Sequence, residues 1–285
     1  MTTLALEACP AYGARDAEAA ELGLRRCAAC GTVYAPEYAD PDEVFVEGYF
    51  EGGAGSYGID TAHPRFQAFM AEVCARRCAF VEALSGVGSL LDVGCGGGEL
   101  LRAAGARGWR AAGAEPMVQA AELARSRAPD ADVRTGLSSE VGFADGSFDV
   151  VCAFHVLEHM PDTRAFLDEL ARLARPGGLV VVETPNYASL LRRRQGSNWI
   201  HLRPLEHLVH FTPETMCSAL AGAELDPVRV ITPTWIVDAH TAGELASELA
   251  LRRPLGVRAF GRGLEALYRR RGVGAVVLAA GRVRG

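Results

Sequence analysis

Two hydrophobic patterns alternate regularly along the last two thirds of the chain. Short, nearly continuous apolar runs are separated by segments whose apolar residues recur at helical spacing. The runs are VGSLLDVG, WRAAGAE, ADVRTG, SFDVVCAF, GGLVVVET, PVRVITP and GAVVLAAGRV. Strands that alternate with helices predict a mostly parallel sheet covered by helices on both faces. The sequence therefore predicts an α/β fold with seven strands.

Several segments lie outside this alternation. The first residues form a turn-rich stretch that ends near EYADPDE, and a Gly- and Tyr-rich loop, GYFEGGAGSYGID, follows it. The next segment, HPRFQAFMAEVCARRCAFVEALSG, has helical spacing and ends at a glycine. We predict a small module over residues 1–45, a flexible loop and lid helix over 46–85, and the sheet domain over 86–285. Helical insertions are expected at 186–211, as a candidate substrate wall, and at 234–272, as an Arg-rich cap or interface.

The amino-acid composition excludes several classes of function. All 29 basic residues are Arg, which excludes lysine Schiff bases, pyridoxal phosphate attachment and the lysine of a phosphate-binding loop. The formal net charge of −6 does not favour nucleic acid as a partner. No apolar run reaches the ~18 to 20 residues of a membrane span, and the N-terminus carries acids where a signal peptide is basic and apolar. We therefore expect a cytoplasmic protein with no membrane partner.

The charge is distributed unevenly along the chain. Residues 1–60 hold eleven acids and three Arg, whereas residues 251–285 hold nine Arg and one acid, Glu265. Mutual attraction of the two ends, or a solvated basic helix, explains this asymmetry, and an anionic partner is the alternative. The sequence leaves both interpretations open, and it also leaves open whether the protein forms an oligomer.

One group of cysteines has the spacing of metal ligands. Cys27 and Cys30 form a Cys-x-x-Cys pair, and Cys9 opens CPAYG, which resembles a zinc knuckle with Tyr12 in place of the second cysteine. Because a structural zinc takes four ligands and three are visible, either a structural zinc or a metal-free remnant of a zinc ribbon fits. Cys74 and Cys78 lie one helical turn apart in an apolar helix and are predicted to face the core.

The first predicted strand of the sheet runs into a glycine-rich loop, LLDVGCGGGELLRAAG. Ligands of open parallel sheets bind at the carboxyl ends of the strands, and glycines let the backbone approach them closely. The spacing is G-x-G-x-G, because position 99 is Glu, so the loop lacks the G-x-G-x-x-G of dinucleotide sites. Glu115 ends the second strand, where a carboxylate can accept hydrogen bonds from both hydroxyls of a ribose, and Met117 can lie on a purine face.

With these features in place, residues from about 86 to 285 resemble a class I S-adenosylmethionine-dependent methyltransferase with a Rossmann-like sheet. The resemblance rests on LLDVGCGGG, GAEP, DGSFDVV, FHVLEHMPD and LARPGGLVVVETPN. The stretch PLEHLVHFTPETM is similar to one in quinone-biosynthesis O-methyltransferases and natural-product tailoring methyltransferases. Some members of that branch also carry an N-terminal zinc knuckle.

The resemblance implies S-adenosylmethionine as the cofactor and assigns its contacts. Asp92 and the loop backbone are expected to hold the methionine part, Glu115 the ribose, and Met117 the adenine. Gly136 to Ser138 replace the acid that usually follows the third strand, so Leu137 is expected to contact the adenine instead. The complete set implied is Asp92, Gly94, Cys95, Gly96, Gly98, Glu115, Pro116, Met117, Leu137 and Phe154.

Candidate catalytic residues follow the fourth strand. His155, Glu158 and His159 are spaced i, i+3 and i+4, which predicts that they share one face of a helical turn. A histidine suits the removal of an acceptor proton near neutral pH, and His155 is the predicted base, with an ionisation near ~6.5 that Glu158 would shift if its carboxylate is close. A structural role in ordering the turn is the alternative. Glu158 and His159 would orient the base or the acceptor, or serve as helix-capping or buried hydrogen-bonding groups.

The acceptor is expected to be a small molecule that is methylated on oxygen in secondary metabolism. His207 and His210 would form a second polar wall, and Tyr57 would close over the site, with ordinary packing as the alternative for each. Methylation on carbon or nitrogen is an open alternative. A nucleic-acid methyltransferase is a further alternative, although FHVLEH stands where such enzymes often carry an [ND]-P-P-[YFW] signature after the fourth strand.

Overall fold

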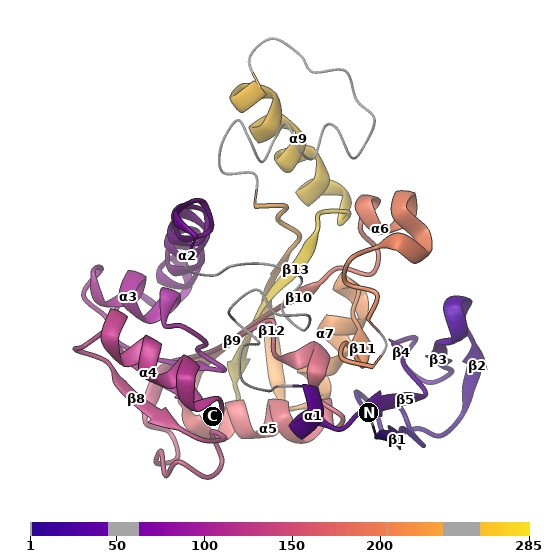
Figure 1. Cartoon of the computed structure of the whole chain (residues 1–285), viewed down its shortest axis with the longest axis horizontal. Coiled ribbons are helices and arrows are strands. Elements are labelled where there is room, and N and C mark those ends of the chain that lie inside the picture. The colour runs from indigo at the N-terminus through magenta and orange to yellow at the C-terminus, as the bar shows by residue number, and fades with distance from the viewer. Residues whose placement is uncertain (1, 45–62, 204, 236–256) are drawn as a thin grey trace.

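The computed structural model of the 285-residue chain describes residues 2–44, 63–203, 205–235 and 257–285 (Figure 1). A seven-stranded sheet forms its centre, in the order β12-β13-β10-β9-β6-β7-β8. The strands are β6 (Ser89–Val93), β7 (Arg110–Glu115), β8 (Asp132–Thr135), β9 (Phe148–Phe154), β10 (Ala174–Pro185), β12 (Leu225–Ile231) and β13 (Val276–Val283). All neighbours are parallel except β13, which runs antiparallel to β10 and β12. The predicted mostly parallel, seven-stranded α/β sheet is confirmed.

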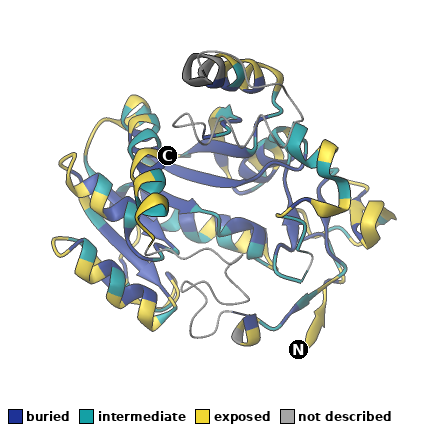
Figure 2. Cartoon of the chain, turned by 45° about the horizontal axis from the view of Figure 1, so that its top comes forward, coloured by how far each residue is buried: buried dark blue, intermediate teal, exposed yellow. Residues whose placement is uncertain are grey.

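Helices cover both faces of this sheet. They are α2 (Pro64–Ser85), α3 (Glu99–Gly105), α4 (Val118–Arg127), α5 (Thr163–Leu173) and α7 (Pro213–Gly222). A further helix, α9 (Val257–Arg271), lies beyond the ends of β10 and β13 (Figure 1). Successive residues of β10 point to opposite faces, so Val180 packs in one apolar core and Val181 in the other (Figure 2). Burial on both faces explains why the strands read as continuous apolar runs. Cys74 and Cys78 are buried in the second core, as predicted.

The N-terminal residues build two small sheets beside the large one (Figure 1). Strands β1 (Thr3–Ala5) and β5 (Glu37–Ala39) pair with each other, and β2 (Ala17–Ala19), β3 (Arg25–Cys27) and β4 (Val33–Tyr34) form a second sheet. Its fourth strand, β11 (Val209–His210), comes from the 186–211 insertion. The N-terminal module therefore shares a sheet with the segment that follows β10 in the predicted sheet domain. The predicted boundary at residue 45 falls outside the described residues.

The rest of the 186–211 insertion packs partly against α9 and partly against the N-terminal module, where Trp199 meets Leu24 and Val33. It contains α6 (Leu190–Gln195) and the short 3₁₀ turn η3 (Gly196–Asn198). Ser189 caps α6 by accepting a hydrogen bond from the backbone N–H of Arg192. Tyr268 of α9 packs against Leu190 and Leu191, which joins the two insertions. The remaining short elements are η1 (Glu21–Gly23), α1 (Pro41–Val44) and η2 (Leu157–His159).

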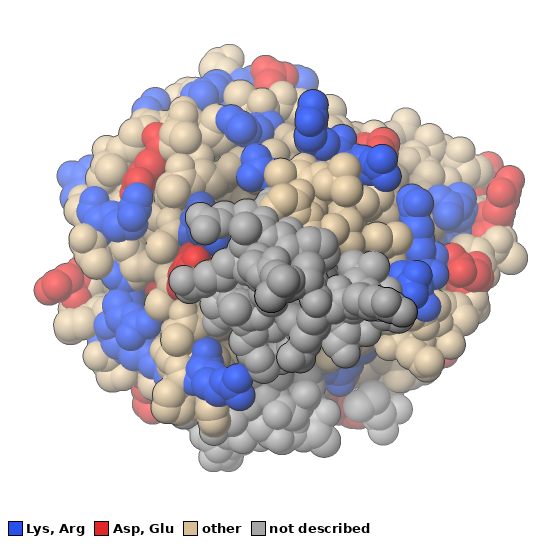
Figure 3. Space-filling model, turned by 90° about the horizontal axis from the view of Figure 1, so that it is seen from above, with Lys and Arg blue, Asp and Glu red and all other residues tan. Residues whose placement is uncertain are grey.

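Basic side chains outnumber acidic ones on the face that carries α6 and α9 (Figure 3). Arg269, Arg270 and Arg271 are exposed at the end of α9. The acidic Glu21 of the N-terminal module pairs with Arg192 of α6 instead of with these residues. Among the described residues, no helix is both long and apolar enough to cross a bilayer.

Candidate active site

The glycine loop after β6 is built from left-handed residues. Gly94, Gly96 and Gly98 have φ angles of 72°, 50° and 79°. A Cβ on Gly94 would lie 2.6 Å from Cγ2 of Val156, and one on Gly98 would lie 2.8 Å from the Cα of Ala124. Both separations are too short for a side chain, and left-handed φ adds a further cost for any other residue. The G-x-G-x-G spacing therefore follows from a tight loop packed between the second half of α4 and the turn after β9.

Glu115, at the end of β7, holds this loop in place. Its Oε2 accepts a hydrogen bond from the backbone N–H of Gly96 (2.9 Å), and its Oε1 accepts one from that of Met117 (3.0 Å). Burial raises the pKa of the carboxyl group, although both hydrogen bonds act in the opposite direction. Each oxygen retains a second lone pair, so the carboxylate can also accept hydrogen bonds from two neighbouring hydroxyls. The predicted contact of Glu115 with a ribose stays a prediction.

The other predicted cofactor residues lie around this centre. Asp92 is buried at the end of β6, and burial raises the pKa of its carboxyl group well above its usual range. The thiol of Cys95 is turned into the protein, where it would meet a Cβ on Gly113 at 2.7 Å, so only its backbone can face a ligand. Leu137 is 53% exposed although it is apolar, and Pro116 is exposed as well. Such exposed apolar surface beside Glu115 suits the face of a purine.

His155 does not lie on a helical turn. Its φ is 57°, and the 3₁₀ turn η2 begins two residues later at Leu157. The prediction that His155, Glu158 and His159 share one face of a helical turn is therefore wrong for His155, because the chain reverses there in a left-handed conformation. His155 and Glu158 are nevertheless neighbours, with 3.2 Å between Nδ1 and Oε1.

A second carboxylate contacts the other nitrogen of the same ring. Nε2 of His155 lies 3.2 Å from Oε1 of Glu183, near the end of β10. Burial opposes a charge on this ring, but the two carboxylates outweigh it and raise the pKa of His155 to about 9. The ionisation near 6.5 that we expected for His155 is not supported by this arrangement.

Glu183 and its partners were missed by sequence reasoning. The side chain of Glu183 is fully buried, forms an ion pair with Arg77 of α2 and accepts a hydrogen bond from Nε1 of Trp235 (3.1 Å). Arg77 also lies over the ring of Phe154, 4.4 Å from its centroid. The available signal was a single acid in the apolar run GGLVVVET and an arginine among the apolar residues of α2. A charge in such a run is buried and needs a partner.

The remaining histidines form a wall that joins η2 to the 186–211 insertion. Ring or carboxylate atoms of Glu158, His159 and His207 all lie within 4.8 Å of one another. Nδ1 of His159 is 2.8 Å from the carbonyl of Glu206, and Nδ1 of His207 is 2.9 Å from that of His201. Burial lowers the pKa of both histidines, so both are neutral near pH 7. The structure thus brings His207 to the predicted catalytic residues.

His210 lies farther along the same wall, where it packs against aromatic rings. Its ring centroid is 5.3 Å from that of Tyr187 and 6.4 Å from that of Trp199. Burial lowers its pKa to about 4. These contacts favour the packing interpretation of His210 over a role in the acceptor wall. Tyr57 lies outside the described residues, so its predicted role stays a prediction.

A family model described as a methyltransferase domain matches residues 66–230, more than half of the chain. The match includes the glycine loop, Glu115 and the histidine wall. The chain belongs to the S-adenosylmethionine-dependent methyltransferases. Its sheet, with β13 inserted antiparallel between β10 and β12, is the sheet of the class I members of this family.

Curated relatives of this methyltransferase include ubiquinone biosynthesis O-methyltransferases. The one from Cereibacter sphaeroides is 33% identical over 150 residues, which cover 49% of this chain and 60% of the relative. The one from Azorhizobium caulinodans is 36% identical over 161 residues, which cover 49% of this chain and 63% of the relative. The chain thus spans about three fifths of the length of these relatives.

Solved structures share the fold of this methyltransferase at low sequence identity. An S-adenosylmethionine-dependent methyltransferase from Thermotoga maritima has a TM-score of 0.55 and 20% identity, covering 82% of this chain and 97% of its own. A geranyl diphosphate C-methyltransferase from Streptomyces coelicolor has a TM-score of 0.52 and 17% identity, covering 78% and 84%. At these identities the similarity shows the fold.

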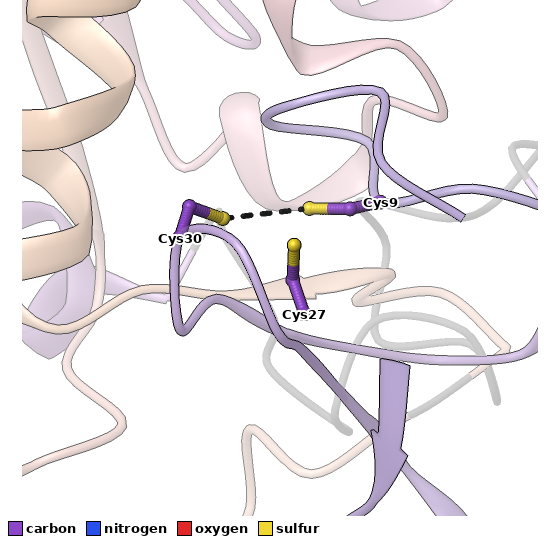
Figure 4. A group of neighbouring side chains, drawn as sticks. All are labelled: Cys9, Cys27 and Cys30. Atoms are coloured by element: carbon purple, nitrogen blue, oxygen red, sulfur yellow. Dashed lines mark hydrogen bonds between the residues drawn. The ribbon is translucent and has the colours of Figure 1, made fainter. Parts of the chain in front are cut away.

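The methyltransferase also carries the predicted cysteine group, in its N-terminal module. Sulfur atoms of Cys9, Cys27 and Cys30 point toward one another from two loops and all lie within 4.8 Å (Figure 4). Cys9 and Cys30 are separated by 3.7 Å between Sγ atoms, close to the ~3.8 Å expected for two thiolates bound tetrahedrally at ~2.3 Å to one zinc ion. Hydrogen bonds from Cys9 and Thr32 outweigh burial and lower the pKa of Cys30 to about 5. Tyr12, which replaces the fourth cysteine, is 64% exposed.

Proposed function

We propose that this methyltransferase methylates an oxygen atom of a small-molecule acceptor in secondary metabolism. The observation that carries the proposal is the contact between the cofactor loop and the histidine wall. Gly94 packs directly against Val156, which lies between His155 and His159. A ligand in the loop would therefore present its reactive end to groups that can hold and deprotonate a hydroxyl. The O-methyltransferase relatives support oxygen as the acceptor atom.

The residues around the loop fit S-adenosylmethionine, which supplies an electrophilic methyl group when bound. Glu115 would hold the ribose hydroxyls, while Met117 and Leu137 would enclose the adenine. The glycine backbone would contact the methionine part, with Asp92 behind it. Because methyl transfer is an in-line displacement, the main tasks of the chain are to orient the acceptor and to remove its proton.

Within the predicted catalytic group, His159 is better suited than His155 to accept a proton. Donation of the Nδ1 proton of His159 to the carbonyl of Glu206 leaves Nε2 as its basic nitrogen. Glu158 lies beside it and would stabilise the imidazolium that forms. His207 would complete the polar wall on the acceptor side. His155, with carboxylates at both nitrogens, would instead order this side of the site.

The experiment that tests the proposal follows label from S-adenosylmethionine. Purified protein is incubated with methyl-labelled cofactor and small-molecule or macromolecular fractions of a cell extract. We expect label in small molecules, at a site that cleavage by hydriodic acid and NMR of the product identify as an O-methyl group. Label in nucleic acid, or on carbon or nitrogen, would support the alternative acceptors, and no label in any fraction would contradict the proposal.

Variants separate the roles of the histidines in the same assay. His159→Gln is expected to reduce turnover by a factor on the order of 10² to 10⁴ while leaving cofactor affinity nearly unchanged. His63→Asn is the matched control, because His63 is an exposed helix cap and Asn is also a good cap. Full activity of the His159 variant would show that His159 is not the base. The proton would then be removed by His155 or His207, or lost by ionisation of the acceptor itself.

We further propose that Cys9, Cys27 and Cys30 hold a structural zinc ion with a fourth donor that is not a cysteine of this group. The three converging sulfur atoms support it. All eight cysteines are free thiols, which supports a reducing compartment such as the cytoplasm. Such a zinc ion would stabilise the module and take no part in methyl transfer.

A further inference from the structure

Glu183 connects three segments that surround the acceptor side of the site. Its Oε1 contacts Arg77 of α2 and His155 after β9, and its Oε2 accepts the indole N–H of Trp235. Glu183 is fully buried and the side chain of Arg77 is 6% exposed. A charge buried this deeply is retained in a fold only when its partners satisfy it, so each of the three segments is fixed relative to β10.

The contacts of His155 determine which protons its ring carries. Each ring nitrogen lies 3.2 Å from a carboxylate oxygen, Nδ1 from Glu158 and Nε2 from Glu183. An ionised carboxylate can only accept hydrogen bonds, and the ion pair with Arg77 keeps Glu183 ionised. Both nitrogens of His155 must then carry a proton, which makes the ring a cation without a lone pair for an incoming proton.

We propose that Glu183 is a positioning residue of the methyltransferase site, which together with Glu158 locks His155 as a fixed imidazolium on the acceptor side. This inference rests on the proposed function, because it assigns the part that this ring plays there. The side chain of His155 is 38% exposed, so one edge of the cation can face an acceptor. Proton removal then falls to another group, and His155 contributes a fixed position and a fixed charge.

The lock matters for the geometry of the site because His155 has a left-handed backbone. Residues other than glycine adopt this conformation at a cost, and the two carboxylate contacts offset it. Val156, the next residue, packs on Gly94 of the cofactor loop. Releasing His155 from Glu183 would let this turn relax and would shift both the loop contact and the wall formed by Glu158.

Charged groups from all the neighbouring elements act on the ring. The carboxylates are Glu158 from η2 and Glu183 from β10, and Arg77 from α2 acts through Glu183. His159 from η2 and His201 from the 186–211 insertion also face the ring, but burial lowers the pKa of both and keeps them neutral. The carboxylates are the two in direct contact, and they outweigh burial in setting the pKa of His155 at about 9. Replacement of Glu183 by an amide removes one of them and leaves the others.

Nitrogen NMR of protein with ¹⁵N-labelled histidine tests the lock without any acceptor, with the His155 signals assigned from a His155→Gln variant. In the wild type we expect both ring nitrogens of His155 to be protonated at pH 7.5. In Glu183→Gln we expect the acid ionisation constant of His155 to increase at least tenfold, which means that its pKa falls. Glu82→Gln is the matched control, because Glu82 also pairs with an arginine and a tryptophan, Arg107 and Trp109, but on the outside of α2. It should leave His155 unchanged.

Turnover supplies the second measurement. In the labelled-cofactor assay, Glu183→Gln should lower the rate by about 10- to 100-fold and keep the affinity for S-adenosylhomocysteine within about threefold. A neutral His155 in the wild type at pH 7.5 would overturn the proposal even if the variant does not fold, and so would an unchanged ionisation in Glu183→Gln. Absence of methyl transfer by the wild type would instead contradict the proposed function and leave the NMR result standing.

Discussion

Replacement of Glu115 by Gln gives a quantitative test of the cofactor site. The two oxygens of Glu115 each accept a backbone N–H, at 2.9 Å from Gly96 and 3.0 Å from Met117. Whichever way the amide of the variant is turned, its NH₂ group faces one of these N–H donors at about 3 Å, and one of the two hydrogen bonds is lost. The same NH₂ group cannot accept a ribose hydroxyl.

The expected loss of affinity follows from these contacts. A hydrogen bond to a charged group contributes about 1.5–3 kcal/mol, so one ribose bond together with the loosened loop amounts to about 2–4 kcal/mol. This free energy corresponds to a rise of about 30- to 700-fold in the Kd of S-adenosylhomocysteine, from a micromolar value in the wild type. The melting temperature of the ligand-free protein should change by only about 3 °C, because the amide also removes a buried charge whose pKa is raised by burial.

Calorimetric titration with S-adenosylhomocysteine measures this effect directly. Glu122→Gln is the control, since Glu122 is exposed on the neighbouring helix α4, and it should bind like the wild type. A Kd within threefold of the wild type in folded Glu115→Gln would refute the ribose assignment. Binding of NAD in place of S-adenosylhomocysteine by the wild type would show that the glycine spacing had been misinterpreted.

Three further predictions concern stability. In Gly98→Ala, residue 98 has a left-handed backbone and its new Cβ would lie 2.8 Å from the Cα of Ala124, so the melting temperature should fall by about 5–15 °C. In the control Gly105→Ala, the new Cβ meets no atom within 4 Å, and the melting temperature should change little in the same thermal scan. Elemental analysis should find at most one zinc per chain, and Cys27→Ser should lower zinc content and melting temperature more than cofactor affinity; the reverse order would contradict a structural zinc. Asp149→Asn should cost about 1–2 kcal/mol at pH 7, because three hydrogen bonds lower the pKa of Asp149 to about 2. Because the pKa of Asp149 is lowered in the folded state, its stabilisation is complete above about pH 3.8 and is lost as the pH falls toward 2. Denaturant titrations should therefore show the difference in unfolding free energy between wild type and Asp149→Asn shrinking over that range. A difference that does not change with pH would exclude this origin.

The elements of the sheet could be predicted from the sequence because their signals are local. A strand buried on both faces needs consecutive apolar residues, and the run GGLVVVET shows this directly. The loop at Gly94, Gly96 and Gly98 could also be predicted, since left-handed backbone in a tight loop selects glycine at those positions. The start of α7 is also encoded locally, because Thr212 caps the helix and Pro213 follows it in the first turn.

The arrangement of charged side chains was decided by tertiary structure alone. Arg77 and Glu183 are 106 residues apart, and their ion pair depends on α2 crossing the ends of β9 and β10. The left-handed turn at His155 has no local signal, because histidine spacing cannot distinguish a helical turn from a reversal that distant carboxylates stabilise. β11 pairs with β4 across about 175 residues of chain, and this pairing places His207 beside His159. Periodicity in a sequence shows which face of an element is buried. The partner of a buried charge depends on which distant elements the tertiary structure brings beside it.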